Sequence, residues 1–474
     1  MIWKIGFLIG IVLFFFSFVC HGQTKKNWSL EDCINYAIDN NIQVKQAKLG
    51  IDLARQNLLQ SKANSLPRVN ANVSHSYNFG RTVDQFTNDF ITQKVQSNNF
   101  SMSGSVILFN GLRNRNSIKQ NRHDLLASQW DSDRMLNDIT LAIANNFMQI
   151  LFNQELVAIS ENQVALSNEQ QKVTSKLVQA GTLARGSLLD VEAQLAQDEL
   201  GLLELNNQLE MSYLTLMQLL DLEYNVDFDI IKPAIQLDGE VQVLSTAGQI
   251  YDAAAANMPQ IKSSSEKRNS AAVALAMAKG GHYPTISLGG SYGTGYSDAR
   301  STVSGINTGL DTLGVTTSGE GVLFPTYSYT YETTPFKDQI DDNLNKSIGF
   351  NMSIPLFNGL QTKTSISRAR IALQNAEYTM ELEKLQLKED IQRSYMDAVA
   401  ALKKYRASEK AVASYHEAFS YVKKKFDVGL VTALDFNEAK NQTGRIRSEL
   451  AQAKYDFIFK TKLLEFYQGN PLVF

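Results

Sequence analysis

A five-residue segment occurs twice in this chain, and the sequence around it repeats as well. Leu-Phe-Asn-Gly-Leu stands at 108–112 and again at 356–360. Each copy follows an alternating, serine-rich run and precedes a long charged run without proline. Because Asn-Gly interrupts a strand, the repeat predicts two strand-to-helix junctions. The junction residues are Asn110, Gly111, Asn358 and Gly359.

Other landmarks keep a regular spacing, which favours duplication over a chance match. Gly181 and Gly429 are 248 positions apart, as are the two pentapeptides. Pro67 and Pro284, each at the end of an earlier helical run, are 217 positions apart. The second copy is therefore 31 residues longer, and the extra residues fall in the Gly-, Ser-, Thr- and Tyr-rich segment 297–346. We interpret the chain as an internal repeat.

Each repeat is predicted to contain a helix, a strand, a loop, a strand, a long helix, a turn and a shorter helix. After its first helix, the first repeat (23–243) is predicted to hold strand 68–79, strand 99–109, helix 112–179, tip turn 180–186, helix 187–220 and connector 221–243. The second repeat (244–474) is predicted to hold strand 285–296, a long loop 297–346, strand 347–357, helix 360–425, tip turn 427–434 and helix 435–467. The two long runs contain neither glycine nor proline, so each predicts about 100 Å of continuous helix.

Residues 1–22 have the pattern of a secretory signal peptide. Lys4 precedes an apolar stretch over 5–19, and Cys20 and Gly22 put small residues at the positions before a cleavage site. A signal anchor and acylation of Cys20 are the alternatives. After cleavage Cys33 would be the only cysteine, which excludes an internal disulfide. We therefore expect an exported protein.

The predicted strands alternate apolar and polar side chains, so one face suits lipid and the other suits water. In strand 68–79 the apolar face holds Val69, Ala71, Val73 and Tyr77. Each strand is about ten residues long, which is the length a tilted strand needs to cross a bilayer. A soluble sheet with one wet face would alternate too. Export, strand length and aromatic residues near the strand ends favour a transmembrane barrel.

Four strands cannot close a barrel, and lipid does not tolerate open strand edges. Two copies would give eight strands around an interior filled by side chains, whereas three copies would give twelve strands and a water-filled bore. The polar inner faces favour three copies. The predicted fold class is thus mixed α and transmembrane β, with four barrel strands and a long α-helical barrel segment per chain, closed only as a trimer.

Nothing in the sequence indicates an enzyme, a metal site or a cofactor. His75, His123, His282 and His416 are scattered, with no cysteine or carboxylate at ligand spacing. A phosphate-binding glycine loop and a nucleophile elbow are also missing. A net charge of −3 without a basic block argues against nucleic acid as a partner. We predict a protein without catalysis.

The chain resembles the TolC family of outer-membrane efflux ducts over essentially its whole mature length. The residues that carry the resemblance are the two-fold repeat, both Leu-Phe-Asn-Gly-Leu junctions, the tip glycines and the second tip, 428–435. The resemblance implies a homotrimer with a twelve-stranded β-barrel in outer-membrane lipid and a long periplasmic α-barrel. It also implies a periplasmic adaptor protein and an inner-membrane pump of the RND or ABC type as partners, in a Gram-negative bacterium.

The resemblance further implies roles for both tips. The family's tips dock the adaptor, and the matching residues here are Gly181, Thr182, Leu183, Gly429, Leu430, Val431 and Thr432. Family members carry acids six and nine positions after the second tip glycine, where they ring a closed aperture; here these are Asp435 and Glu438. After the first tip glycine only the farther position is acidic, Asp190. A helix-capping role is the alternative for Asp435 and Asp190.

The function expected from these observations is a passive outer-membrane exit duct of a tripartite efflux system, with energy supplied by the pump. Two alternatives remain open. One is the outer-membrane channel of a type I protein secretion system, since the duct wall alone does not set the cargo. The other, from a different class, is an exported scaffold of coiled helices whose strands are soluble.

Overall fold

The computed structural model describes residues 27–83, 88–92, 94–223, 228–233 and 245–472, so the predicted signal peptide 1–22 and most of the predicted connector 221–243 lie outside them. The chain divides into two compact units. Unit 1 comprises Met1–Leu53, Leu126–Glu266 and Glu377–Phe474, and unit 2 comprises Ala54–Leu125 and Lys267–Ala376. Each unit therefore contains parts of both sequence repeats. Among the described helices, none is both long and apolar enough to cross a lipid bilayer.

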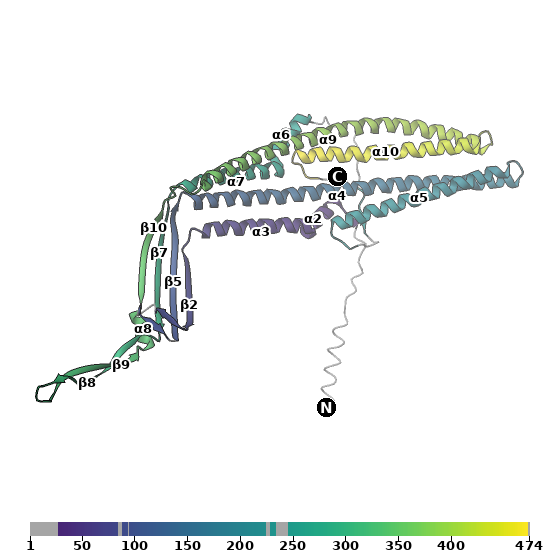
Figure 1. The fold of residues 1–474 in the computed structure, drawn as a ribbon. Helices are drawn as coiled ribbons and strands as arrows, with labels where there is room; N and C mark the ends of the chain where they lie inside the picture. The colour runs from purple at the N-terminus through teal and green to yellow at the C-terminus, as the bar shows by residue number, and fades with distance from the viewer. Residues whose placement is uncertain (1–26, 84–87, 93, 224–227, 234–244, 473–474) are drawn as a thin grey trace, which may run out of the picture. The chain divides into compact units, whose positions relative to one another are not determined.

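Unit 2 is built on a four-stranded antiparallel sheet (Figure 1). Its strands in spatial order are β10 (Asn345–Ser353), β7 (Thr285–Ser297), β5 (Val95–Asn110) and β2 (Arg68–Asn78). The register brings like residues together, because Asn70, Ser103, Ser291 and Ser347 form one row across all four strands. Side chains of neighbouring rows point to opposite faces.

One face of this sheet is apolar and the other is polar. The apolar face includes Val69, Ala71, Val73, Phe100, Met102, Leu288, Tyr292, Ile348, Phe350 and Met352. Every residue of β2 and β10 is exposed, and Ile348 and Phe350 are 81% and 76% exposed. Within the described residues β2 and β10 are therefore uncovered on both faces, and these two edge strands are unpaired on their outer sides.

The inserted segment of the second repeat is structured, which corrects the prediction of a long loop over 297–346. It contains β8 (Ser301–Val315) and β9 (Gly321–Thr333), which pair only with each other, and the short helix α8 (Phe336–Asp342). The first repeat has a smaller pair at this point, β3 (Arg81–Val83) with β4 (Phe90–Thr92). The alternation of threonine, tyrosine and aliphatic residues in β8 and β9 suits extended backbone.

The strand predicted over 347–357 ends at Ser353 instead. Its partner β7 begins at Thr285, which faces Ser353, so the next residues find no partner there. Pro355 also lacks the N–H that a ladder needs. In the first repeat β5 runs on to Asn110, after a register shift between Ile107 and Phe109. The two junctions are therefore alike in the helix that follows and different in the strand that precedes.

The two long helices are continuous, as the absence of glycine and proline predicts. They are α4 (Arg113–Gln179) and α9 (Gln361–Asp427), each of 67 residues and each running from unit 2 into unit 1. The antiparallel partners are α5 (Arg185–Leu219) and α10 (Ala433–Tyr467). We call α4 with α5 the first hairpin and α9 with α10 the second hairpin (Figure 1).

The helix expected at the start of each repeat is broken in two. α2 (Leu30–Asn40) is followed by α3 (Ile42–Ala63), and α6 (Ala247–Asn257) by α7 (Pro259–Lys279). Asn41 and Met258, the residues between them, have ψ of 129° and 131°. Pro259 disfavours helical backbone in the residue before it, which explains the second break. At the first break the Asn41 side chain accepts from Gln43 and Val44 and restarts the helix.

The main apolar core of unit 1 lies where the first hairpin meets α2 and α10. Ile143, Phe147, Ile150, Leu151, Leu216 and Leu220 are almost fully buried there, together with Cys33, Tyr455 and Ile458. The edge of this core carries a two-residue parallel pairing of β1 (Asn27–Trp28) with β6 (Asp229–Ile230). A second cluster joins α6, α9 and α10 around Ile250, Ile391 and Leu464. The first cluster joins the two hairpins, and both clusters lie at the ends of α5 and α10 away from their tip turns.

Candidate functional site

Both hairpins reverse direction through the same turn. Gly181 and Gly429 have φ of 76° and 75°. In the first tip, Thr182 N–H donates to Leu177 O at 2.9 Å and Gly181 N–H donates to Val178 O at 3.0 Å. The second tip repeats both bonds with Leu430, Lys425 and Phe426 at 2.8 and 2.9 Å. This is a Schellman C-cap, in which glycine takes the left-handed position without a Cβ penalty.

The two tips differ in how the next helix begins. α10 starts after Thr432, whose side chain and that of Asp435 cap each other's backbone N–H groups. α5 starts after Ala184, which provides no side-chain cap. Both helices begin two residues earlier than the predicted starts at 187 and 435. The Thr182 hydroxyl instead donates to Leu177 O at 2.7 Å and closes the preceding helix.

The structure places Asp435 in the capping role that the sequence left open. Its carboxylate accepts from Thr432 N–H at 2.9 Å and from the Thr432 hydroxyl at 2.7 Å. The hydrogen bond from the Thr432 side chain, followed by that from its backbone, lowers the pKa of Asp435 from its ordinary value. Asp435 therefore stays ionised at neutral pH while still exposed at the surface. Glu438 lies one turn farther along α10 and is also exposed.

Asp190 is exposed on α5. The structure therefore assigns it neither to the aperture nor to a helix cap. The apolar residues of the tips are exposed too, with Leu183 at 38% and Leu430 at 74%. Val431 is partly buried. Both leucines are therefore accessible at the surface beside their turns.

The two junctions share an unusual backbone. Gly111 and Leu112 have φ of 67° and 63°, and Gly359 and Leu360 have φ of 58° and 66°. A leucine at positive φ is sterically unfavourable, and it recurs at the same position in both repeats. The backbone at Gly111 also lies close to that of Gly280, since a Cβ on Gly111 would lie 2.2 Å from Gly280 O. A Cβ on Gly359 would meet nothing within 4 Å.

The asparagine of each junction bonds to the first turn of the helix that follows, and Asn110 also caps that helix. Asn110 Oδ1 accepts from Asn114 N–H at 3.2 Å, and Asn110 Nδ2 donates to Asn114 Oδ1 at 2.7 Å. Asn358 Nδ2 donates to Thr362 Oγ1 at 2.6 Å. In the first copy, Asn-Gly-Leu therefore ends a strand, reverses the chain and caps a helix within three residues.

Sequence reasoning missed a buried ionic group between the hairpins, which we call the buried link: Lys440, Asp198 and Ser167. Lys440 Nζ donates to Asp198 Oδ2 at 2.5 Å and also to Ser167 Oγ, which itself donates to Asp198. The Lys440 and Asp198 side chains are only 1% and 9% exposed. The link joins α10 of the second hairpin to both helices of the first.

The buried link belongs to a polar contact that runs toward the tips. Beyond Val157 the buried residues of α4 are all polar: Ser160, Ser167, Gln170 and Thr174. On α10 the buried Asn437 and Thr443 flank Lys440. Both amide atoms of Gln170 are buried without a hydrogen-bond partner among the described residues. The seven-residue spacing of Ser160, Ser167 and Thr174 is the sequence signal that could have indicated this polar surface.

Contacts inside the second hairpin are apolar by contrast. The Phe436 ring lies 4.9 Å from that of Phe426 and 5.4 Å from that of Phe419, measured between centroids. Near its tip the second hairpin is thus packed through aromatic rings, while the two hairpins meet there through polar groups. A polar contact without an apolar core separates more readily than a packed one.

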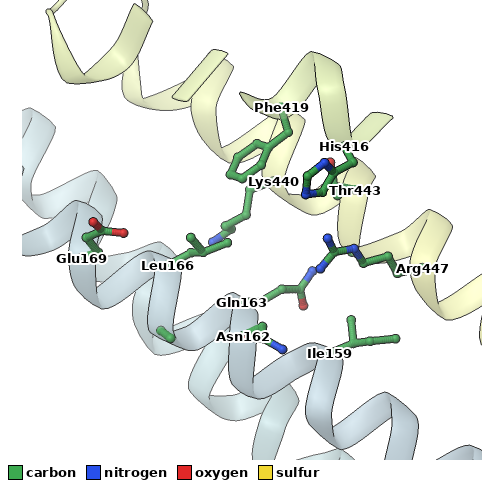
Figure 2. Close-up of a pocket in the computed structure, with 12 residues that line it drawn as sticks. Ile159, Asn162, Gln163, Leu166, Glu169, His416, Phe419, Lys440, Thr443 and Arg447 are labelled. Carbon is green, nitrogen blue, oxygen red and sulfur yellow. The ribbon is translucent and has the colours of Figure 1, made fainter. Parts of the chain in front are cut away.

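A cavity of about 330 Å³ lies beside the buried link, between α4, α9 and α10 (Figure 2). Figure 2 shows Lys440 extending from α10 toward α4 and Gln163 pointing toward Arg447. Glu169 at its edge pairs with Lys423 at 2.9 Å, which is a second and more exposed ion pair between the hairpins. Within the described residues no group of three or more His, Cys, Asp or Glu side chains is placed to hold a metal ion.

The family model and the two relatives described here are all outer membrane proteins. The family model described as "Outer membrane efflux protein" matches residues 33–221 and 250–458. The chain is 21% identical to the outer membrane efflux protein BepC of Brucella suis, over 93% of this chain and 85% of that protein. It is 24% identical to the outer membrane protein TolC of Vibrio cholerae, over 91% of this chain and 88% of that protein.

A solved structure has the same fold. The outer membrane protein VceC from Vibrio cholerae superposes with a TM-score of 0.74, at 16% identity, over 94% of this chain and 97% of that chain. At 16% identity this structural similarity is evidence for a shared fold and not for a shared activity.

Proposed function

We propose, since the chain belongs to the outer membrane efflux protein family, that it is the exit duct of a tripartite efflux system. In this role it conducts substrates passively from an inner-membrane pump to the outside of a Gram-negative cell. A periplasmic adaptor joins it to a pump of the RND or ABC type. The duct itself carries out no reaction.

The observation that carries this proposal is the four-stranded sheet with both faces open and both edges unpaired. Its apolar face would be costly in water, and its free edges would be costly in lipid. A homotrimer resolves both problems, because β10 of one protomer can pair with β2 of the next until twelve strands close. The apolar face then meets outer-membrane lipid and the Asn- and Ser-rich face lines a wet bore.

The two tips are the proposed contact with the adaptor. Leu183 and Leu430 are exposed beside rigid Schellman turns, so they present apolar surface in a defined place. Gly181, Thr182, Gly429, Val431 and Thr432 shape the turns that carry them. Because both tips occur once per chain, a trimer presents six such contacts.

The proposed aperture uses Asp435 and Glu438, with Asp190 as a third acid. Three copies of each side chain around one axis would concentrate negative charge at a constriction and attract cations. The cap that Asp435 forms with Thr432 supports this role, since it fixes the carboxylate in place and keeps it ionised. The buried link then holds the second hairpin against the first while the duct is shut.

The test of the duct combines two measurements on the full-length protein. We expect a trimer that resists dissociation in cold detergent and changes gel mobility on heating, and we expect discrete single-channel currents in planar bilayers. A soluble periplasmic monomer without channel activity would contradict the proposal and favour the coiled scaffold. Co-purification after cross-linking then identifies the adaptor and shows whether the pump is of the efflux or the secretion type.

The adaptor contact has its own test. Leu430→Asp should abolish efflux without lowering the yield of trimer, because Leu430 is exposed and its turn is formed by backbone bonds. Leu430→Met, which keeps the apolar surface, is the matched control and should retain efflux. Efflux at the parental level in Leu430→Asp would remove this tip from the docking surface.

A further inference from the structure

The ribbon formed by β8 and β9 has two faces of opposite chemistry. Its register places Ile306 opposite Tyr329, Thr308 opposite Tyr327, and Leu310 opposite Pro325. Because side chains alternate along a strand, these pairs share one face. That face, which we call the tyrosine face, comprises Val303, Ile306, Thr308, Leu310, Thr312, Leu323, Pro325, Tyr327, Tyr329 and Tyr331.

The opposite face is mostly polar. It carries Thr302, Asn307, Asp311, Thr326, Ser328, Thr330 and Glu332, with Val322 and Phe324 as apolar exceptions near the turn. The two register shifts in the pairing both fall on β8, so β9 keeps a strict alternation along its whole length. The division between the faces therefore follows from β9, where three tyrosines alternate with threonine and serine.

The tyrosine face is uncovered within the chain. Tyr327, Tyr329 and Tyr331 are 53–60% exposed, and Leu310 is 68% exposed. Together these side chains form a continuous exposed face along the ribbon, and contiguous apolar surface of this kind is typical of an interaction site. A two-stranded ribbon is also only marginally stable by itself in water. Both considerations require something to cover this face.

The charges of the ribbon limit which partner can cover the tyrosine face. Residues 301–333 contain no lysine or arginine, and their three acids are Asp311, Glu320 and Glu332. Asp311 and Glu332 lie on the polar face and Glu320 lies next to the turn. An acidic ribbon without a base is repelled by an anionic membrane surface. An identical ribbon, whose tyrosine face is uncharged, can pack against it without a charge conflict.

The base of the ribbon is firmly attached to the sheet of unit 2. The Gln339 side chain of α8 is fully buried; its Nε2 donates to Ser297 O at 2.9 Å and to Thr334 O at 2.8 Å, and its Oε1 accepts from Ser297 N–H. Arg300 donates to Asp342 and to Asn343, each at 2.9 Å. The ribbon is therefore presented in a defined direction, which reduces the entropy lost when it packs.

We propose that the three ribbons of the homotrimer pack together through their tyrosine faces, as a bundle outside the twelve-stranded barrel. This inference rests on the proposed trimer, which brings three ribbons to the same end of one tube. Tethering of this kind raises the local concentration of the partners to the millimolar range.

Cysteine cross-linking in the outer membrane of intact cells tests the packing. Tyr329→Cys places a thiol on the tyrosine face, and the neighbouring Ser328→Cys places one on the polar face. The native Cys33 is buried and gives little background. With mild oxidant we expect on the order of tenfold more disulfide-linked dimer from Tyr329→Cys than from Ser328→Cys, because tethered facing thiols meet at high local concentration.

Labelling with a water-soluble maleimide provides a second measurement on the same variants. Tyr329→Cys should be protected in the trimer and become reactive when heating dissociates it, whereas Ser328→Cys should react in both states. An intact trimer with equal cross-linking at both positions would overturn the ribbon bundle alone. Protection of Tyr329→Cys only in membranes, and not in the detergent-solubilised trimer, would identify lipid as the cover and overturn it too. A parent protein without any trimer would overturn the proposed duct together with this inference.

Discussion

Gly181 and Gly429 show how much a single residue decides in this protein. Both hold left-handed backbone at the end of a helix, and the 248-residue spacing predicted that they are equivalent. Their role could be inferred from the sequence because a glycine between two helical periodicities is typical of a helix C-cap. Gly111 and Gly359 could be placed in turns for a different reason, because Asn-Gly between a strand pattern and a helical run predicts a reversal. The unfavourable φ of the leucine that follows each of these could not be inferred, since no local rule places leucine there.

Replacement of a tip glycine should loosen its turn. Gly429→Ala places a Cβ at φ 75°, which should destabilise the tip by about 1 kcal/mol. Gly186→Ala is the matched control, because Gly186 lies inside α5 without a positive φ and a Cβ there meets nothing. That control should stabilise the helix by up to about 1 kcal/mol. Hydrogen exchange of the amides in each tip measures both effects, and equal behaviour of the two variants would contradict the assignment.

Asp435 combines two roles that substitutions can separate. Asp435→Asn keeps a good capping side chain and removes the charge, whereas Thr432→Ala removes the cap and keeps the charge. We expect cation block of single-channel currents to weaken in Asp435→Asn, and also in a Glu438→Gln variant, but to persist in Thr432→Ala. Unchanged block in both acid-to-amide variants would leave Asp435 as a helix cap only.

The pH dependence of this block follows from the direction of the pKa shift. The folded pKa of Asp435 lies below its ordinary value of 3.8. Its cap therefore stabilises the tip at every pH above that value, and the stabilisation is lost as the pH falls through the lowered pKa. Block that depends on Asp435 should accordingly be constant from about pH 7 to about pH 5. Loss of that block within this range would show that another group controls it.

At the scale of elements, the sequence predicted the two helical hairpins but not the contact between them. Two uninterrupted runs of helical sequence determined α4 and α9, because a 67-residue run without glycine or proline has no other ordinary fold. Lys440, in contrast, resembles many solvent-facing lysines in its sequence. Only the packing of α10 between α4 and α5 buries it beside Asp198. Nothing local distinguishes it.

The buried link gives a sharp prediction. Lys440→Met leaves Asp198 buried without its partner, which should cost about 3–5 kcal/mol in the free energy that holds the two hairpins together. The double variant Lys440→Met with Asp198→Leu should regain most of that loss, since an apolar replacement of a buried ion pair is often nearly neutral. Denaturant unfolding and hydrogen exchange of α10 measure the difference.

The exposed pair of Lys423 with Glu169 is the control for that experiment. Lys423→Met removes a pair whose Glu169 side chain is 60% exposed, so its effect should stay below about 1 kcal/mol. If opening of the hairpins admits current, Lys440→Met should also raise the resting conductance, and Lys423→Met should change it little. Equal effects of the two substitutions would show that burial of the link has no special role.

At the scale of the whole molecule, the sheet decides what the chain needs from its surroundings. The sequence predicted strands of about the observed length and alternation. It did not predict that β10 ends at Ser353, nor that the second loop folds into a ribbon with its own helix at the base. Both depend on where β7 begins and ends, which is a property of strand pairing and not of a single segment.

The orientation of the sheet can be tested with two neighbouring substitutions. Phe350→Lys places a charge on the apolar face, where we expect a loss of about 2–4 kcal/mol if that face meets lipid. Asn351→Lys changes the next residue of the same strand, which lies on the polar face beside Ser287, and should be tolerated. Trimer yield in the outer membrane and unfolding in liposomes measure both. If Asn351→Lys were more damaging than Phe350→Lys, the polar face of the sheet would be the one that meets lipid.

The sequence by itself determined the duplication, the long helices, the tip turns and the alternating strands. These follow from local rules: which residues allow a helix, which allow positive φ, and which alternate along a strand. The tertiary structure alone decided that Lys440 is buried and that the inserted segment forms a ribbon with a tyrosine face. Each of these depends on groups brought together from distant positions or on a register between strands, and local rules contain neither.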